Sequence, residues 1–513
     1  MSEFSAAFQK MRQGGSARDG GVCSDKKVKI RFALSEAVLR RARRHLQEAR
    51  CVALMRDERK GRLLIRYKAC SMSNLTVTSG TLGLRPTEAS AEGLTATTNT
   101  LVRDFCTPSA GLVRQAKAPS QERDLDMDAL ESSIKSKVSI LVSDAAASVL
   151  LSSDMLRAKR PRASSGAIVS DMPNVKIVGR DCAHASTRLL KNPFRQHDAL
   201  NSLMNEFVTG WNSFAQKVFH SDLFKGWWKE AIQGQQQEGP EDDYQTGTGI
   251  CSAKHRFASH ALPLGRMAKN AAAVLAVCHR VHAVRGDQAL WSAQLLKHLD
   301  GKKLLLLSMA ADAAHVALDF TRLLDEEGAD IAQLNDQAAQ FGNAIRSLFV
   351  DGEVLRLPTF TNDMLRQLEG SGLAVLLDGT VRELRASPDD KRSCLQIMRE
   401  WVQGAEACLQ AEFPSWHLLA SFGVFNLKSR KTSKPEDPAA VRDSLCKLAK
   451  VFGLNAPALT RQYAQFAPIA LGLQKQGSFS NRAAWAEAIA RTKGSRASTR
   501  AKFAAKELEE AGH

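Results

Sequence analysis

The stretch CVALMRDERKGRLLIRYKACS, residues 51–71, decides how the first part of the chain folds. Two runs rich in Val, Leu and Ile flank DERKG, a group of charged residues that ends in glycine. Apolar runs on both sides of such a turn signal predict a β-hairpin. The next segment, NLTVTSGTLGL (74–84), is expected to form a third strand and so to complete an antiparallel meander.

Beyond the meander, helices and strands are expected to alternate. In order along the chain, the predicted elements are a helix near 95–106, the strand VSILVS (138–143), a helix over 145–156, the strand VKIVG (175–179) and a helix that starts with CAHASTRLLKN (182–192). The order β, β, β, α, β, α, β, α is that of a ribonuclease H-like mixed sheet. In such a sheet the first and fourth strands lie side by side.

The character of the sequence changes at about residue 196, where strand signals nearly vanish and long segments with helical spacing take over. The fold class expected is therefore α/β plus all-α, a ribonuclease H-like mixed sheet followed by a large helical insertion region. The predicted domains are a disordered segment (1–32), the ribonuclease H-like domain (33–195), the helical insertion domain (196–420) and a helical C-terminal region with a basic tail (421–513).

The chain is strongly basic, with 71 Lys and Arg against 54 Asp and Glu among 513 residues and a formal net charge of +17. This charge favours an anionic partner such as nucleic acid, although a basic but otherwise ordinary surface would give the same total.

A helix is predicted in ALSEAVLRRARRHLQEAR (33–50), and its two faces differ in character. One face is apolar and the other is rich in arginine, with Val38, Leu39, Ala42 and Leu46 on the first and Arg40, Arg41, Arg43 and Arg44 on the second. An arginine face of this kind either contacts phosphates or is simply solvated.

Cysteine usage and hydropathy indicate the cellular compartment of the protein. Ten cysteines without a C-x-x-C pair indicate a reducing compartment and no structural zinc finger. CHRVH (278–282) lies in an Ala- and Val-rich helical stretch and is expected to pack rather than to bind a metal. Without an apolar leader or a run of about 18 uncharged apolar residues, the expectation is an intracellular protein with no membrane partner, nuclear if the source is eukaryotic.

Asp57 and Asp144 are the candidate catalytic and metal-binding residues, because each ends a predicted strand, the first and the fourth. Two ionised carboxylates in contact repel each other, and a divalent cation such as Mg²⁺ or Mn²⁺ removes the repulsion. Two such ions about 4 Å apart would clamp the attacking and leaving oxygens of a phosphodiester. Alternatively, Asp57 is a residue of the hairpin turn and Asp144 is the N-cap of the next helix.

Over roughly residues 35–430 the chain resembles the hAT-superfamily transposases, a DDE-type family with a ribonuclease H-like fold. The blocks that carry the resemblance are RDERKGRLLIRY (56–67), ILVSDAAASVLL (140–151), NVKIVGRDCAHASTRLL (174–190), AKHRFASHALPLGRM (253–267), DGKKLLLLSMAADAAHVALDFTRLLDEEG (300–328) and FPSWHLLASFGVFNL (413–427).

The resemblance implies a DNA cut-and-join enzyme, or a descendant of one, that uses a DDE triad on two metal ions. Asp57 and Asp144 would then be metal ligands. Asp181 and His184, in the C/D-x-x-H motif beside Cys182, would organise the strand end and the DNA next to it. Arg256 and Phe257 would contact a displaced base or stack on it.

The chain also departs from the family pattern. Phe257 stands where the family has Trp, and the family's N-terminal zinc finger is missing. The third acid and the C-terminal dimerisation block are not found before His513, although Glu400, Glu406 and Glu412 are available. Cleavage and strand transfer are therefore expected to be impaired, and a homo-oligomer is left open.

Two other interpretations remain at this stage. The first is a non-catalytic nucleic-acid-binding or helical interaction protein on the same scaffold, and the second is a helical scaffold with no nucleic-acid role. In either case GRDCAHAS (179–186) is a helix start with a core histidine and a buried cysteine. The tryptophans are expected to pack in the helical core, including Trp211 and the pair Trp227 and Trp228.

Overall fold

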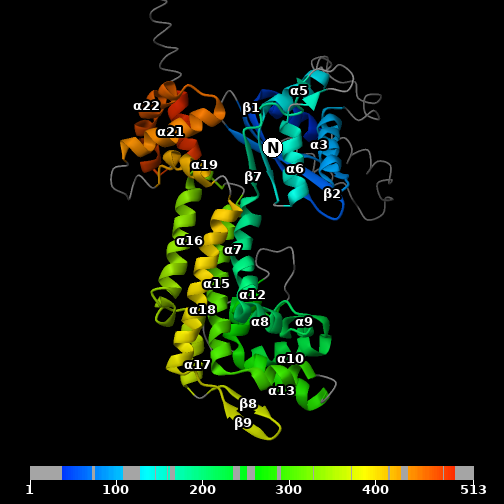
Figure 1. Ribbon diagram of the computed structural model, residues 1–513, viewed down its shortest axis with the longest axis vertical. Helices are drawn as coiled ribbons and strands as arrows, with labels where there is room; N and C mark the ends of the chain where they lie inside the picture. Colours follow the sequence, from blue (N-terminus) through cyan, green and yellow to red (C-terminus); the bar gives the residue numbers. More distant parts are fainter. Residues whose placement is uncertain are drawn as a thin grey trace, which may run out of the picture. The chain divides into compact units, whose positions relative to one another are not determined.

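The computed structural model describes residues 37–71, 76–107, 127–144, 146–158, 160–161, 168–234, 243–250, 260–285, 290–326, 329–370, 372–413, 416–428, 437–477 and 479–491. The expected disordered segment 1–32 and the basic tail beyond 491 lie outside these residues. The chain divides into two compact units, Met1–Val178 and Gly179–His513, and each is described by itself (Figure 1).

A five-stranded mixed sheet with the strand order β3-β2-β1-β4-β7 forms the first unit. β1 (Ala49–Glu58) pairs antiparallel with β2 (Arg62–Ser71), and β2 pairs antiparallel with β3 (Val77–Pro86). β4 (Val138–Ser143) lies parallel to β1 on its other side, and β7 (Ile177–Arg180) follows β4 in the sheet. The predicted meander and the adjacency of the first and fourth strands are confirmed.

Lys60 and Gly61 form the two-residue turn between β1 and β2, with φ angles of 52° and 70°. The Arg59 N–H donates to the Arg62 carbonyl at 2.8 Å, and the Arg62 N–H donates to the Arg59 carbonyl at 3.1 Å. A two-residue loop in which both φ angles are positive twists in the same sense as the strands, and glycine adopts it without strain. DERKG thus fixes the register of the hairpin.

Helices pack against the sheet and bury the apolar side chains of its strands. They are residues 37–48, α3 (Ala91–Cys106), α5 (Met127–Lys137) and α6 (Ala147–Arg157). Alternate residues of the strands enter this core, so that Leu54, Ile65 and Leu141 are fully buried. A separate two-stranded pair joins β5 (Arg160–Pro161) to β6 (Ile168–Val169).

The helix over residues 37–48 differs from its predicted two-faced pattern at Val38 and Arg43. Val38 is 67% exposed, whereas Leu46 is fully buried as expected. Arg43 is buried, its Nε donates to the Phe105 carbonyl at 2.7 Å, and its guanidinium lies over the Phe105 ring. Arg43 therefore ties this helix to the end of α3 and does not belong to a phosphate-binding face.

The second unit is predominantly helical, and it begins at Gly179, so that the helix over residues 182–196 belongs to it and not to the predicted domain 33–195. Its helices are α7 (Cys182–Gln196), α8 (Asp198–Phe207), α9 (Phe214–His220), α10 (Asp222–Gln233), α11 (Asp243–Thr246), α12 (Ala261–Lys269), α13 (Ala271–Arg285), α14 (Leu290–His298), α15 (Gly301–Asp325), η4 (Ile331–Gln333), α16 (Leu334–Phe349), η5 (Glu353–Leu355), α17 (Phe360–Glu369), α18 (Pro388–Glu412), α19 (Trp416–Ser421), η6 (Phe422–Phe425), α21 (Pro438–Phe452), α22 (Ala456–Lys475) and residues 481–491.

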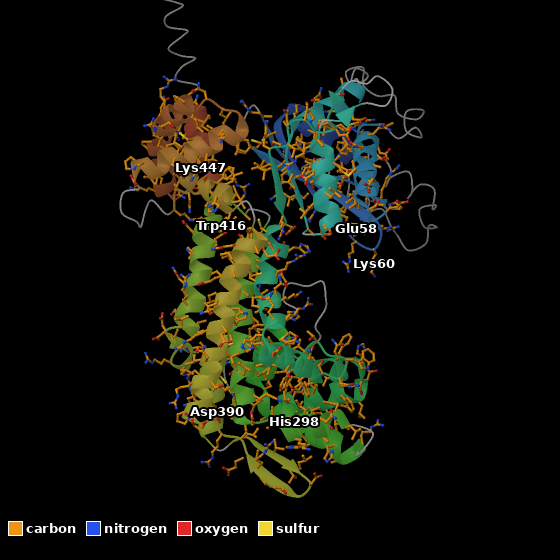
Figure 2. The ribbon with its side chains drawn as sticks, in the orientation of Figure 1. Glu58, Lys60, His298, Asp390, Trp416 and Lys447 are labelled. Carbon is orange, nitrogen blue, oxygen red and sulfur yellow. The ribbon has the colours of Figure 1, made fainter. Side chains whose placement is uncertain are left out.

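Three long helices, α7, α15 and α18, pack along one another at the centre of this unit (Figure 1). α18 begins at Pro388 because Ser387 and Asp390, the latter labelled in Figure 2, form a reciprocal capping box. α15 is the one helix among the described residues that is long and apolar enough to cross a membrane, and 83% of its most apolar window is buried inside the protein. Such burial is the property of a core helix.

Asp312 is a buried carboxylate in the middle of α15 that caps another helix. It accepts hydrogen bonds from the Phe360 N–H at 2.9 Å and from the Thr361 N–H at 3.0 Å, which are the first two amides of α17. The Thr361 hydroxyl also donates to it, at 2.6 Å. Burial raises the pKa of Asp312 to about 7, although these hydrogen bonds act in the opposite direction.

A β-hairpin interrupts the helices where none was predicted. β8 (Ala374–Leu377) pairs with β9 (Thr380–Glu383) around Asp378 and Gly379, which have φ angles of 50° and 75°. The signal is present in the sequence as Asp-Gly between two runs that contain Val and Leu. These strands are only four residues long, and the helical composition around them hides the pattern.

Candidate nucleic-acid and metal site

Asp57 and Asp144 lie at the same edge of two neighbouring parallel strands. In the register of β1 and β4, Arg56 is paired with Ser143. The pairing ends there, one residue before Asp57 and Asp144. The structure thus places the two residues that the sequence singled out at the ends of neighbouring strands.

The local roles offered as alternatives for these residues do not hold as stated. Asp57 lies within β1, paired with Leu64, and the hairpin turn that follows is made by other residues; Glu58 and Lys60 are labelled there in Figure 2. The N-cap of α6 is Ala146 and not Asp144. The Asp144 carboxylate does accept a hydrogen bond from the Ala146 N–H at 3.2 Å, through its Oδ1.

Arg56 places a buried positive charge next to this pair. Its side chain is 3% exposed, and the guanidinium donates to the Ser152 hydroxyl and the Val149 carbonyl at 2.9 Å each, and also to the Ser153 hydroxyl. Burial lowers the pKa of Arg56 to about 10, and the charge of Asp144 opposes this shift. The Asp144 carboxylate is therefore partly compensated by Arg56 without a metal ion.

A third carboxylate does not join the pair among the residues that the structure describes. There, no group of three or more His, Cys, Asp or Glu side chains is placed to hold a metal ion. Glu400, Glu406 and Glu412, the acids available for the third position, all belong to α18 in the second unit and all have partners. Glu400 contacts His197 at 3.1 Å, and Glu406 pairs with Arg346 at 2.6 Å.

Glu412 has the most extensive set of contacts of the three. Its Oε2 pairs with Arg180 at 2.8 Å and with Arg188 at 3.5 Å, and Asn192 donates to its Oε1 at 3.4 Å. Arg180 also donates to the Ala411 carbonyl at 3.1 Å. Since Glu412 is only 8% exposed, this cluster fastens the end of α18 to the start of α7.

Asp181 and His184, the predicted DNA-organising residues, occupy the first turn of α7. Asp181 is the N-cap, and its Oδ1 accepts the His184 N–H at 3.0 Å, with the His184 Nδ1 at 3.5 Å. Burial acts to raise the pKa of the Asp181 carboxyl, but the contacts with His184 outweigh it and hold the pKa below its usual value. The His184 side chain is 55% exposed, so the core-histidine alternative is wrong.

The other candidates divide between described and undescribed residues. Arg256 and Phe257 lie outside the described residues. Trp227 and Trp228 are buried, as predicted, and Cys278 of CHRVH is buried in the core. Trp211 contradicts its prediction as a core residue, because it is 79% exposed.

Sequence reasoning missed a pocket on α7, α8 and α9 that includes Lys191, Arg195 and Gln216. Its residues come from three helices, the loop after α8 and the residue before α12 (Ala261–Lys269), and they match no motif, so only the folded chain brings them together. The weak signal in the sequence is the pair Lys191 and Arg195, which are spaced by one helical turn without an acidic residue between them.

Comparison with known proteins gives no match, either to protein-family models or to curated proteins.

Proposed function

We propose that this protein is a transposase-derived DNA-binding protein with a ribonuclease H-like core, in which the ancestral metal-dependent strand cleavage is impaired. The observation that carries the proposal is the parallel pairing of β1 with β4, which ends at Arg56 and Ser143, one residue before Asp57 and Asp144. The order β3-β2-β1-β4-β7 supports the same core, because three antiparallel strands are followed by a parallel strand beside the first.

The charge supports DNA as the partner. A net charge of +17 attracts a polyanion at long range, and each phosphate neutralised by Lys or Arg releases counterions. Affinity for duplex DNA should then fall steeply with salt, with a slope of about −0.9 per phosphate contact on logarithmic axes. A gel-shift titration over a range of KCl concentrations tests this half of the proposal, and a missing or salt-insensitive shift contradicts it.

The metal chemistry of the family fits the described residues only in part. Asp57 and Asp144 offer carboxylate oxygens, which hard cations such as Mg²⁺ and Mn²⁺ prefer. A third acidic ligand is not among the described residues around them, and the buried Arg56 charge works against a divalent cation at Asp144. We therefore derive no reaction step through a metal. This donor set also favours the second candidate, a non-catalytic nucleic-acid-binding protein on the same scaffold.

A nicking assay separates the two candidates. Supercoiled plasmid is incubated with Mg²⁺ or Mn²⁺ and with wild type, Asp144→Asn or the matched control Asp154→Asn, which alters an exposed carboxylate of α6 that pairs with Arg157. Residual cleavage is expected to be slow and to disappear in Asp144→Asn but not in the control. Equal activity in Asp144→Asn contradicts the catalytic role, and binding without cleavage by all three proteins establishes the non-catalytic candidate.

A further inference from the structure

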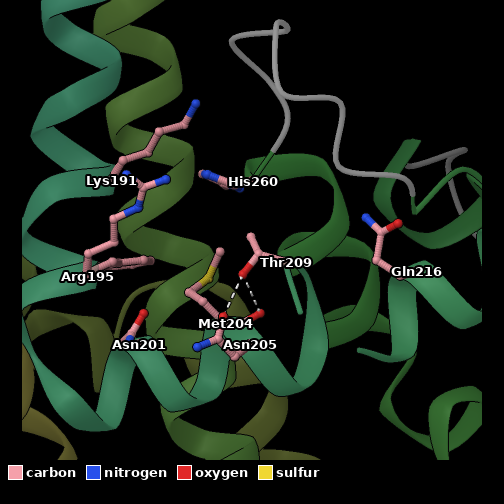
Figure 3. Close-up of a pocket in the computed structure, with 9 residues that line it drawn as sticks. Lys191, Arg195, Asn201, Met204, Asn205, Thr209, Gln216 and His260 are labelled. Atoms are coloured by element: carbon pink, nitrogen blue, oxygen red, sulfur yellow. Dashed lines mark hydrogen bonds between the residues drawn. The ribbon is translucent and has the colours of Figure 1, made fainter. Parts of the chain in front are cut away.

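The second unit contains a pocket of about 550 Å³ between α7, α8, α9 and His260. This volume lies in the range of roughly 300–1,000 Å³ that is typical of sites for small organic molecules. Figure 3 shows Arg195 extending from α7 toward His260, Lys191 pointing upward from the same helix, and Asn205 and Thr209 below them.

The pocket is positively charged, which favours an anionic ligand. Neither Lys191 nor Arg195 forms an ion pair with a described residue, and the described residues that line the pocket include no Asp or Glu. Burial lowers the pKa of the Lys191 ammonium, and the nearby charges of Arg195 and Arg188 lower it further. A phosphate between Lys191 and Arg195 would relieve this repulsion and would accept hydrogen bonds from both side chains.

The rest of the lining matches a heterocyclic base better than a second phosphate. Asn201, Asn205 and Gln216 present side-chain amides, which can both donate and accept hydrogen bonds. The Asn205 amide oxygen already accepts from the Thr209 hydroxyl at 3.2 Å, which leaves its NH₂ group to donate. Phe194 and Met204 add an apolar wall. Amides of this kind pair with the edge of adenine, which carries one donor and one acceptor side by side.

An exposed aromatic ring stands in the loop that joins two of these helices. Trp211 follows Thr209 by two residues, is 79% exposed, and lies 6.1 Å from the His220 ring, measured between ring centroids. Large aromatic side chains are usually buried in a core of this size, and an exposed indole close in sequence to a pocket residue offers a stacking face for a base.

We propose that the pocket formed by Lys191, Arg195, Asn201, Asn205 and Gln216 binds a nucleotide, with its phosphate on the two basic residues and its base on the amides. The inference rests on the proposed function only for the source of that nucleotide. The DNA-binding protein would hold an unpaired nucleotide of a strand here, whereas a pocket for free nucleotide would take the same chemistry from solution.

Calorimetric titration tests the pocket with two probes, deoxyadenosine monophosphate and the single strand (dA)₁₂. The variant Lys191→Gln/Arg195→Gln is compared with the control Arg356→Gln/Arg392→Gln, which removes two charges that are each about three-quarters exposed in the same unit. We expect the pocket variant to lose at least tenfold in affinity for the bound probe, and the control less than twofold. Gln216→Leu should weaken binding of the nucleotide but not that of inorganic phosphate.

The probes also identify the source of the nucleotide. Binding of (dA)₁₂ without measurable binding of the mononucleotide indicates an unpaired nucleotide in a strand, and the reverse indicates a free nucleotide. The inference is overturned if wild type binds neither probe, if the pocket variant binds like wild type while both keep the same circular dichroism spectrum, or if inorganic phosphate competes as well as the nucleotide. If wild type binds the nucleotide but not duplex DNA, the proposed function is overturned and the inference about the pocket stands.

Discussion

Replacing Glu412 by Gln tests whether this acid is a structural anchor between α18 and α7. At 2.8 Å the Glu412–Arg180 pair has a gross attraction of about 6 kcal/mol at an effective dielectric constant of 20, and desolvation of both groups offsets much of it. Arg180 is 22% exposed and Arg188 is 40% exposed, so water compensates part of the loss. We expect the free energy of unfolding to fall by about 2 kcal/mol.

The assay is denaturant unfolding followed by circular dichroism, with a double-mutant cycle that pairs Glu412→Gln with Arg180→Met. Glu406→Gln is the matched control, since Glu406 lies on the same helix and pairs with Arg346, which is 55% exposed. The control should cost less than about 1 kcal/mol. A Glu412→Gln protein as stable as the control refutes the anchor.

Three further predictions concern a buried acid, a close backbone contact and a thiol. Because the pKa of Asp312 is raised from 3.8 to about 7, the folded chain holds more protons than the unfolded chain between these values. The contribution of Asp312 to stability is complete below about pH 4 and is lost as the pH rises through 7, by up to about 4 kcal/mol. The stability of wild type relative to Asp312→Asn should therefore decrease over this pH range. A difference that stays constant with pH contradicts the raised pKa of Asp312. Gly301→Ala should lower the free energy of unfolding by at least about 2 kcal/mol, because the added Cβ collides with the Arg385 carbonyl at the start of α15. An unchanged melting temperature would show that the backbone at Arg385 moves away at little cost. The Cys51 thiol, opposite Cys70 on β1 and β2, lowers the pKa of Cys70 to about 7, so Cys70 should react with iodoacetamide at neutral pH and Cys51→Ala should slow that reaction; an unchanged rate rules out the thiol contact.

The predictable part of the fold is local in sequence. Apolar runs around Lys60 and Gly61 suffice for the hairpin, since two positive φ angles there leave one turn type. The strand over 138–143 and the helix that follows Asp181 are equally clear, because a short run rich in Val, Ile and Leu marks the first and an N-cap residue marks the second.

Only the part of the candidate site that depends on strand order could be predicted from the sequence. The first and fourth strands are neighbours, as the predicted topology implies, and this adjacency is the basis for expecting Asp57 near Asp144. The burial of Arg56 under α6 and the pairing of Glu412 with Arg180 depend on side-chain packing between distant segments, and no local pattern carries that information. The exposure of Trp211 is a similar case, because its burial is decided by whether another helix covers it.

Anomalous diffraction from crystals soaked in millimolar Mn²⁺ tests most directly whether Asp57 and Asp144 form one cation site. The account predicts a peak within about 2.5 Å of a carboxylate oxygen of each residue, with partial occupancy because other acidic ligands are lacking among the described residues. A peak at only one of the two, or two well-ordered carboxylates that point away from each other with no density between them, would contradict it.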